Sequence, residues 1–308
     1  MQVAGIRRVG ARVEMIEAAE PRPLAGDEVL LEVRAAGVAV WDEFVRTGGW
    51  DVGAKPPSAL GVEAAGTVLA VGQAVGDFAP GDAVMTHPVP LRDQGTWAPR
   101  LIAPAGLLAR KPPSISWEVA ATFPVPALTA EQVLSDALNI QAGEQLLVHA
   151  AGGVTGGLLV ALGALRGAQV IATAGPASQQ RVSALGARQV IDYHDQEWPE
   201  QVRAITGRRG VAAAVNAAPG GAASAIRAVA DGGRLATITQ DPPSQQRGIT
   251  VSDIYVRADG NQLRKLGQLL GDGQLEIPIT ASYRLADAAK ALAQATGGHV
   301  GGAIVLTP

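Results

Sequence analysis

The sequence predicts an α/β protein in which a doubly wound parallel sheet is joined to a β-rich domain. Three observations support this prediction. The length of 308 residues suits two domains of ordinary size. Residues 1–115 read as short strands broken by turns, whereas from about residue 119 strands and helices alternate. We therefore place a β-rich domain at 1–120 with 257–308, and the doubly wound domain at 121–256.

The β-rich domain is predicted from three strand-like segments punctuated by Gly, Pro and Asp: 28–40, 66–72 and 81–90. In the second domain, 117–138 has the apolar spacing of a helix, 144–150 is an apolar strand, and 154–167 is a helix. Further strands are expected at 169–175, 188–193, 211–217, 233–239 and 248–256. Because strands buried on both faces are continuously apolar, these segments favour a parallel sheet covered by helices. Helices at 261–270 and 285–295 and a strand at 301–308 complete the chain.

Composition excludes several classes of function. Apolar residues make up 47% and charged residues 17%, which is typical of a globular chain. The net charge is −3 and the basic residues are dispersed, so no nucleic-acid partner is expected. The absence of cysteine excludes disulfides and every thiolate metal site. The N-terminus has no apolar signal core and no apolar run reaches about 18 residues, so we expect a cytoplasmic protein without a membrane span.

The segment VHAAGGVTGG (148–157) carries the chemistry. Its spacing Ala150-x-x-Gly153-x-x-Gly156 follows a predicted strand and opens a predicted helix. A dinucleotide needs a tight turn, a bare backbone beside its pyrophosphate, and the unpaired amides of a helix N-terminus. The segment therefore predicts a Rossmann dinucleotide site. The residues expected to hold the cofactor are Ala150, Gly152, Gly153, Val154, Thr155 and Gly156.

The end of the second strand of this unit decides between NAD and NADP. An acid there would hold the ribose hydroxyls of NAD, but the chain has Thr173 and Gly175 with no acid. Ser178, Arg181 and Tyr193 follow and could bind a 2′-phosphate, so NADPH is favoured over NADH. The alternative for Arg181 is a solvated helix residue.

The ordered motifs resemble the zinc-independent quinone oxidoreductases, the zeta-crystallin-like branch of the medium-chain dehydrogenase/reductase superfamily, over essentially the whole chain. The motifs are RAAGV (34–38) followed by Asp42, GVEAAGTV (61–68), GDAV (81–84), LTA (128–130), the Gly-rich loop, IDY (191–193) and GGRL (232–235). The resemblance implies a GroES-like first domain and hydride transfer from NADPH to a quinone or an α,β-unsaturated carbonyl compound. It also implies that Thr129, Ile238 and Thr239 contact the cofactor.

Zinc-containing relatives place a Cys and a His where this chain has Ala39 and Val62, so no catalytic zinc is expected. The four histidines are scattered and are interpreted as structural: His87, His149, His194 and His299. The chain also departs from quinone oxidoreductases, which usually carry Asn at position 39, tyrosines at positions 44 and 50, and a Lys at position 303.

By the same resemblance, the nicotinamide is expected in a cleft between the domains. An apolar wall would suit a flat or hydrophobic carbonyl substrate, and we assign to it Val40, Trp41, Phe44 and Trp50. Asp42 and Glu63 are candidate general acids by position only. Their structural alternatives are a helix cap for Asp42 and a buried arginine partner for Glu63. Water is an equally consistent proton source.

Two other enzyme classes do not fit. Short-chain dehydrogenases require Tyr-x-x-x-Lys, and Tyr193, Tyr255 and Tyr283 each lack that Lys; phosphate-loop NTPases require Gly-Lys-Ser/Thr. Two alternatives stay open. One is an enoyl reductase of a polyketide or fatty-acid-type pathway, and the other is a non-catalytic NADPH-binding protein. We also predict a homodimer formed through the apolar strand 248–256, because an exposed strand edge invites pairing.

Overall fold

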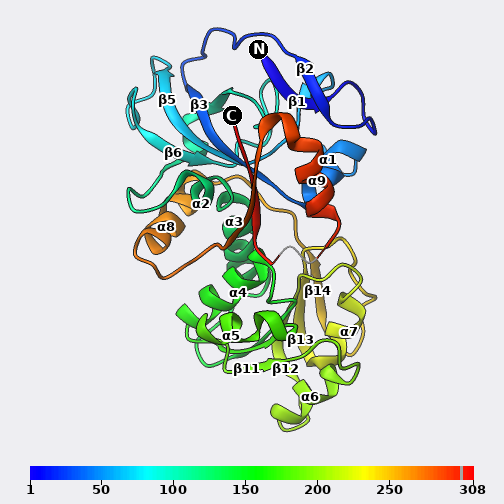
Figure 1. Cartoon of the computed structure of the whole chain (residues 1–308). Helices are drawn as coiled ribbons and strands as arrows, with labels where there is room; N and C mark the ends of the chain where they lie inside the picture. Colours follow the sequence, from blue (N-terminus) through cyan, green and yellow to red (C-terminus); the bar gives the residue numbers. More distant parts are fainter. Residues whose placement is uncertain (299–300) are drawn as a thin grey trace. The chain divides into compact units, whose positions relative to one another are not determined.

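The computed structural model describes residues 1–298 and 301–308, and these form two units (Figure 1). Unit 1 comprises Met1–Leu128 and Arg257–Pro308, and unit 2 comprises Thr129–Val256. The division falls at 128/129, within helix α3 (Pro124–Gln132), whereas the sequence placed it at 120/121. His299 lies outside the described residues.

Unit 1 contains two sheets. In the larger sheet, the strand order is β15-β16-β3-β5-β6-β8, with β7 also paired to β3. Its strands are β3 (Glu28–Val38), β5 (Ala64–Val71), β6 (Ala83–Thr86), β7 (Arg100–Pro104), β8 (Leu108–Arg110), β15 (Ile279–Arg284) and β16 (Ala303–Thr307). The smaller sheet has the order β2-β1-β4 and consists of β1 (Gln2–Ile6), β2 (Glu14–Glu17) and β4 (Ser58–Ala59). The predicted β-rich domain is confirmed, and its last strand comes from the chain's C-terminal segment.

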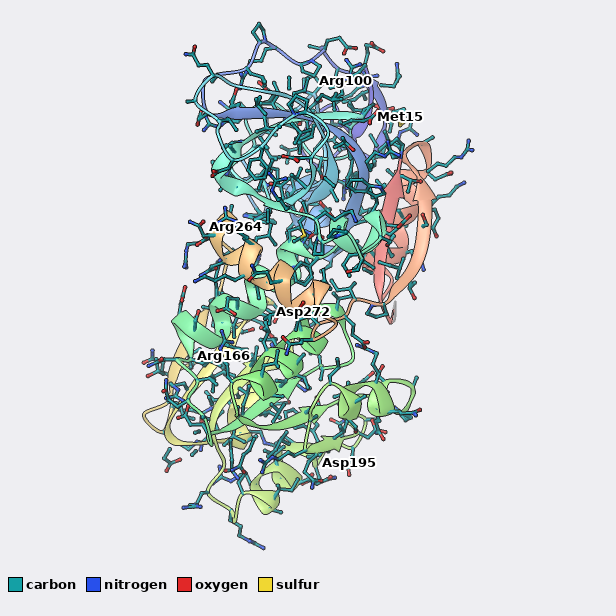
Figure 2. The ribbon with its side chains drawn as sticks, turned by 90° about the vertical axis from the view of Figure 1, so that its left-hand side faces the viewer. Met15, Arg100, Arg166, Asp195, Arg264 and Asp272 are labelled. Atoms are coloured by element: carbon teal, nitrogen blue, oxygen red, sulfur yellow. The ribbon has the colours of Figure 1, made fainter. Side chains whose placement is uncertain are left out.

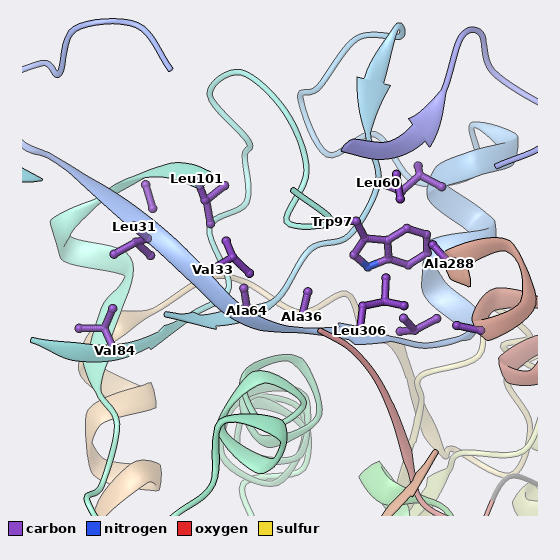
Figure 3. Packing of buried hydrophobic residues seen from close by; sticks show 14 of the residues in the cluster. Leu31, Val33, Ala36, Leu60, Ala64, Val84, Trp97, Leu101, Ala288 and Leu306 are labelled. Carbon is purple, nitrogen blue, oxygen red and sulfur yellow. The ribbon is translucent and has the colours of Figure 1, made fainter. Parts of the chain in front are cut away.

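The core of unit 1 forms around β3, whose inward residues alternate along the strand. Leu31 and Val33 are buried while Glu32 between them is exposed, as a strand with one buried face requires. Figure 3 shows these side chains beside Leu101 and the large ring of Trp97. Trp97 is fully buried, and its Nε1 donates to the carbonyl oxygen of Gly37 at 2.9 Å. One aromatic side chain thus fills the core and satisfies a buried backbone acceptor.

Helices of unit 1 are α1 (Val40–Thr47), α2 (Trp117–Ala121), α8 (Gly260–Gly271) and α9 (Ala288–Thr296). The prediction of one helical stretch over 117–138 is wrong in detail. The segment is divided into α2, α3 and a π-helical turn (Val133–Ala137). Pro124 cannot supply the amide hydrogen that would continue α2, but it is well suited to the first turn of a new helix.

Unit 2 is a doubly wound sheet of six parallel strands in the order β11-β10-β9-β12-β13-β14. Its strands are β9 (Gln145–His149), β10 (Gln169–Thr173), β11 (Gln189–Ile191), β12 (Val211–Asn216), β13 (Val229–Thr237) and β14 (Thr250–Asp253). Its helices are α4 (Val154–Leu165), α5 (Pro176–Ala184), α6 (Trp198–Ile205) and α7 (Ala222–Ala228). The predicted fold class is confirmed. The strand order reverses between β9 and β12, and the carboxyl ends of strands beside such a reversal are where doubly wound sheets bind ligands.

The strand predicted at 248–256 is shorter in the structure and forms β14 at the edge of this sheet. In the part of the chain that is described, no helix has the length and apolar character needed to cross a membrane.

Replacing Trp97 by Phe tests the core of unit 1. The change removes ring volume and leaves the carbonyl of Gly37 without its buried donor, so the free energy of unfolding should fall by about 2–4 kcal/mol. Urea denaturation followed by circular dichroism measures this loss. Val9→Ala is the control, since Val9 is 52% exposed and its loss should change stability by less than about 0.5 kcal/mol. Equal denaturation midpoints for both variants would contradict the role given to Trp97.

Candidate cofactor site and the buried carboxylates

The loop that joins β9 to α4 has the geometry of a phosphate cradle. It begins at Ala150, whose φ of 66° lies in the left-handed region. Gly153 is exposed and forms the N-cap of α4, so the free amides of that helix follow it. Any phosphate at this turn would also meet the positive end of the helix dipole. The predicted strand–loop–helix arrangement is therefore present, with Val154 and Thr155 in the first turn of α4.

The physical reason for a glycine differs between two positions of this loop. A Cβ on Gly156 would lie 2.3 Å from the carbonyl oxygen of Ala150, so the protein's own packing forbids a side chain there. A Cβ on Gly153 would meet no protein atom closer than 3.9 Å. Gly153 also has an ordinary φ of −79°, so its own backbone does not require glycine. Open space in front of a bare helix N-terminus fits the close approach of a ligand's phosphates.

Thr173, the last residue of β10, contacts the first residue of the loop through its hydroxyl group. It is fully buried, and its Oγ1 accepts from the amide of Ala150 at 3.0 Å and lies 2.7 Å from Nδ1 of His149. We predicted that Thr173 would lie at the cofactor; in the structure its hydroxyl is committed to protein groups. Burial lowers the pKa of His149 to about 4, so this ring is neutral near pH 7.

Helix α5 brings two predicted residues to the same loop. Nη2 of Arg181 donates to the carbonyl oxygen of Gly152 at 2.5 Å, and a Cβ on Gly152 would lie 3.1 Å from Oγ of Ser178. Gly175 caps α5, and a Cβ on it would lie 3.5 Å from the hydroxyl of Tyr193. Ser178 and Arg181 therefore lie against the Gly-rich loop, and Tyr193 against the start of α5.

Thr129, which was also predicted to contact the cofactor, lies on α3 and is buried.

A polar network at the carboxyl ends of β12 and β13 was missed by the sequence reasoning. Asn216 ends β12 and Thr237 ends β13, and both contact the carboxylate of Asp241. Thr239, predicted to bind cofactor, belongs to this network, and the amide of Ile238 donates to the carbonyl of Asn216. The available signal was a polar residue that closes the apolar strand VAAAVN at the same sheet edge as the Gly-rich loop.

The two candidate acids of unit 1 both cap helices. Asp42 is fully buried, and its Oδ2 accepts from the amide of Ala39 at 2.9 Å, which closes the first turn of α1. Glu63 is 2% exposed, and its Oε2 accepts from the amide of Val125 at 2.8 Å in the first turn of α3. The structural alternative for Asp42 is confirmed. The expected arginine partner of Glu63 is wrong, because a backbone amide takes that place.

Burial raises the pKa of both carboxyl groups. For Asp42, it raises the pKa to about 8, although the bond from Ala39 opposes the shift. For Glu63, burial raises the pKa well above its ordinary value, and the nearby charge of Asp42 adds to the shift. Both groups are therefore held mainly as neutral acids near pH 7.

The predicted substrate wall follows Ala39. Val40, Trp41 and Phe44 lie on α1, and the ring of Trp50 is 6.1 Å from that of His87. Val40 is 42% exposed, whereas the other three are partly buried.

The two positions that hold zinc ligands in zinc-containing relatives carry apolar side chains. Val62 is fully buried, and its carbonyl oxygen lies 2.7 Å from Nδ1 of His87. Within residues 1–298 and 301–308, no group of three or more His, Cys, Asp or Glu side chains could hold a metal ion.

Unit 1 also has a hollow of about 1100 Å³ that is separate from these residues. It is lined by α8, including Arg264 (Figure 2), and by the segment 110–114. The cations of its lining are held by protein groups: Arg110 bonds Asp82 at 2.7 Å, the amine of Lys111 donates to backbone carbonyls, and Arg264 donates to the amide oxygen of Asn261 at 3.0 Å.

Asp42→Asn tests the burial of this carboxyl group. Between its ordinary pKa of 3.8 and about 8, folded Asp42 keeps a proton that the unfolded chain has released, so stability falls as pH rises through that window. One such group contributes up to about 1.4 kcal/mol per pH unit. The variant keeps an oxygen for the amide of Ala39 but does not titrate, so its stability should fall less between pH 5 and 8. Denaturation at constant ionic strength measures both slopes.

The exposed Asp272 provides the control for this experiment. Asp272→Asn should keep the parental slope. Identical slopes for Asp42→Asn and the parent protein would show that Asp42 is ionised in the folded state.

Comparison with known proteins agrees with this geometry. Residues 25–112 match the family described as the alcohol dehydrogenase GroES-like domain, and residues 185–306 match the family described as zinc-binding dehydrogenase. The chain is 35% identical over 297 residues to erythronolide synthase EryA2 of Saccharopolyspora erythraea. That match covers 93% of this chain but only 8% of the synthase.

Two solved structures align over the full length of this chain. One, described as an NAD-dependent alcohol dehydrogenase, has a TM-score of 0.89 and 29% identity, with 100% of each chain covered. The other is a quinone oxidoreductase of Pseudomonas syringae pv. Tomato DC3000, with a TM-score of 0.88, 25% identity and 99% of that chain covered. Together with the fold and the Gly-rich loop, these matches show that the chain is a quinone oxidoreductase-like member of the medium-chain dehydrogenase/reductase superfamily.

Proposed function

We propose that this protein is an NADPH-dependent reductase that reduces a quinone or an α,β-unsaturated carbonyl compound without zinc. The observation that carries the proposal is the open, side-chain-free turn at Gly153, which leads directly into the amides of α4. Bound NADPH would supply the hydride, and the protein would supply binding and orientation.

Several residues support the choice of NADPH. The end of β10 carries no acid that would repel a 2′-phosphate. Arg181 and Ser178 lie beside the loop, so a modest rotation of either side chain would present a phosphate donor. The bond from Arg181 to Gly152 also orders the loop, a role that the sequence did not predict. Tyr193 lies next to Gly175 on the same side of the sheet.

The absence of a zinc donor set affects how a developing negative charge on the substrate would be stabilised. Ala39 and Val62 offer no ligand atom, so hydrogen-bond donors or water would take this role. Asp42 and Glu63 each hold a backbone amide and are closed off from solvent, which favours water as the proton source. The apolar and aromatic residues of α1, together with Trp50, suit a flat or hydrophobic carbonyl compound.

An enoyl reductase is the second candidate, and one observation favours it. The matched relative EryA2 is named as an erythronolide synthase, and the match covers nearly all of this chain. A structure described as CurK enoyl reductase shares the fold with a TM-score of 0.86 at 21% identity. The same cofactor site would serve both activities, so the substrate decides between them.

The assembly and location of the protein are part of the proposal. β14 lies at the edge of the unit 2 sheet, and a homodimer would pair this edge with a second copy. A cytoplasmic location stays a prediction.

A substrate panel tests the activity. Oxidation of NADPH, followed by its absorbance, should be accelerated by quinones or enones and more weakly supported by NADH. Turnover confined to enoyl thioesters would favour the second candidate. Binding of NADPH with no turnover of any acceptor would show a non-catalytic NADPH-binding protein. No binding of either coenzyme in calorimetry would contradict the proposal.

A matched pair of glycine variants tests the cradle. Gly153→Ala places a methyl group where the protein has room but a pyrophosphate would not. It should keep the parental unfolding free energy within about 0.5 kcal/mol and weaken NADPH binding at least about tenfold. Gly156→Ala should lower both, because its methyl group collides with the carbonyl of Ala150.

Isothermal calorimetry and urea denaturation separate the two effects. Unchanged NADPH affinity in Gly153→Ala would mean that the coenzyme does not approach this turn.

A further inference from the structure

The polar network around Asp241 lies at the carboxyl edge of the unit 2 sheet. The strand order reverses between β9 and β12, and a dinucleotide bound at such a sheet extends across the reversal. Arg181 and Tyr193 come from the β10–β11 side, where we place the adenosine half. The nicotinamide half would then extend over β12 and β13. The ends of these two strands carry Asn216 and Thr237.

Several hydrogen-bond donors hold the carboxylate of Asp241 over these strand ends. Its Oδ1 accepts from the hydroxyl groups of Thr237 and Thr239, both at 2.6 Å. Nδ2 of Asn216 lies 3.2 Å from Oδ1, and the amide of Ala222 lies 3.3 Å from Oδ2. Although burial alone would raise the pKa of Asp241, these donors lower it below its ordinary value, so the group is a carboxylate near pH 7.

The backbone directs this carboxylate back onto the sheet. Gln240, directly before it, has a φ of 59°, a left-handed conformation that is unfavourable for a residue other than glycine. Such a turn persists only where surrounding contacts hold it. The contacts of Asp241 with Thr237 and Thr239 provide that hold.

A count of hydrogens fixes the orientation of the two threonines. A carboxylate only accepts, so each hydroxyl group spends its one hydrogen on Asp241. The hydroxyl oxygens of Thr237 and Thr239 lie 3.0 Å apart and can bring no further hydrogen to each other. Thr237 is fully buried, whereas Thr239 is partly exposed. Nδ2 of Asn216 donates to the hydroxyl oxygen of Thr239 at 2.9 Å, which uses one of its two lone pairs. Thr239 therefore presents an oxygen that can accept one further hydrogen bond from a ligand but cannot donate one.

We propose that Asp241 is a positioning residue that fixes Thr239 as an acceptor for the carboxamide N–H of the nicotinamide. The inference rests on the proposed function and adds to it a group that orients the reactive ring. The carboxamide NH₂ is the donor that the nicotinamide ring itself offers, and an oxygen whose own hydrogen is held by Asp241 and which keeps one free lone pair is its complement. Orientation of the ring decides which of its faces meets the substrate, so this contact would matter for hydride transfer.

The experiment compares two oxidised coenzymes that differ only at this group. NADP⁺ has a carboxamide, and its 3-acetylpyridine analogue has a methyl ketone that cannot donate. Calorimetry on the full-length parent protein should show NADP⁺ binding roughly three- to tenfold more tightly than the analogue. Thr239→Val should bring the ratio close to one. Asp241→Asn should also reduce it, because its amide can donate to Thr239 and occupy the acceptor.

Two controls separate this role from a structural one. Thr239→Ser keeps the hydroxyl group and should keep the parental ratio. Asp231→Asn removes a carboxylate that is 76% exposed on β13 and should leave the ratio unchanged. A merely structural role would weaken both coenzymes equally and leave the ratio of their affinities constant.

Three outcomes would overturn the inference. One is equal binding of both coenzymes by the parent protein. The second is an equal loss of both in Thr239→Val or Asp241→Asn, which would show that these residues do not contact the carboxamide. The third is that the parent protein binds neither coenzyme; this outcome would also overturn the proposed function, whereas the first two leave it standing.

Discussion

The Gly-rich loop of unit 2 depends on the hydrogen bonds that Thr173 makes with its first residues. Ala150 has a left-handed backbone, which costs on the order of 1 kcal/mol for a residue with a Cβ. The hydroxyl group of Thr173 accepts from the amide of Ala150, and its carbonyl oxygen accepts from the amide of Ala151 at 2.9 Å. These two bonds hold the turn at the start of the loop. The carbonyl of Ala150 then lies where only a glycine at 156 can pass it, so the direction of α4 follows from the same turn.

The loop therefore separates structural requirements from binding requirements along a few residues. Gly156 allows α4 to pack on the sheet. Gly153 has open space around it and ordinary backbone angles, so the fold itself does not require a glycine there. Across the strand reversal, a second turn with a left-handed residue, Gln240, directs Asp241 onto the ends of β12 and β13. Both turns are held by threonines at strand ends, Thr173 on β10 and Thr237 on β13. The hydroxyl of Thr173 accepts from a backbone amide, whereas that of Thr237 donates to a carboxylate, so a threonine orders the carboxyl edge of the sheet on each side of the reversal by a different bond.

Local patterns in the sequence predicted most of the fold. Alternation of apolar strands and helices gave the parallel sheet, because strands buried on both faces must be apolar. The spacing of residues 150–156 gave the loop and its helix. The prediction over 117–138 failed in detail because apolar periodicity continues through Pro124 although the hydrogen-bond pattern does not. Asp241 was missed for another reason. It contacts Asn216, 25 residues away in the sequence. The left-handed backbone of its neighbour Gln240 cannot be recognised from the residue types.

The direction in which a side chain points was the property that was hardest to predict from the sequence. Thr173 was correctly placed at the end of β10, but this strand is buried on both faces, so the side chain of Thr173 is fully buried inside the protein. Asp42 and Glu63 likewise follow motifs of the family, yet each is closed within unit 1 against a backbone amide. In each case a carboxyl group holds the first turn of a helix, so these residues position α1 and α3. Under the proposed function, the proton for reduction would then come from water.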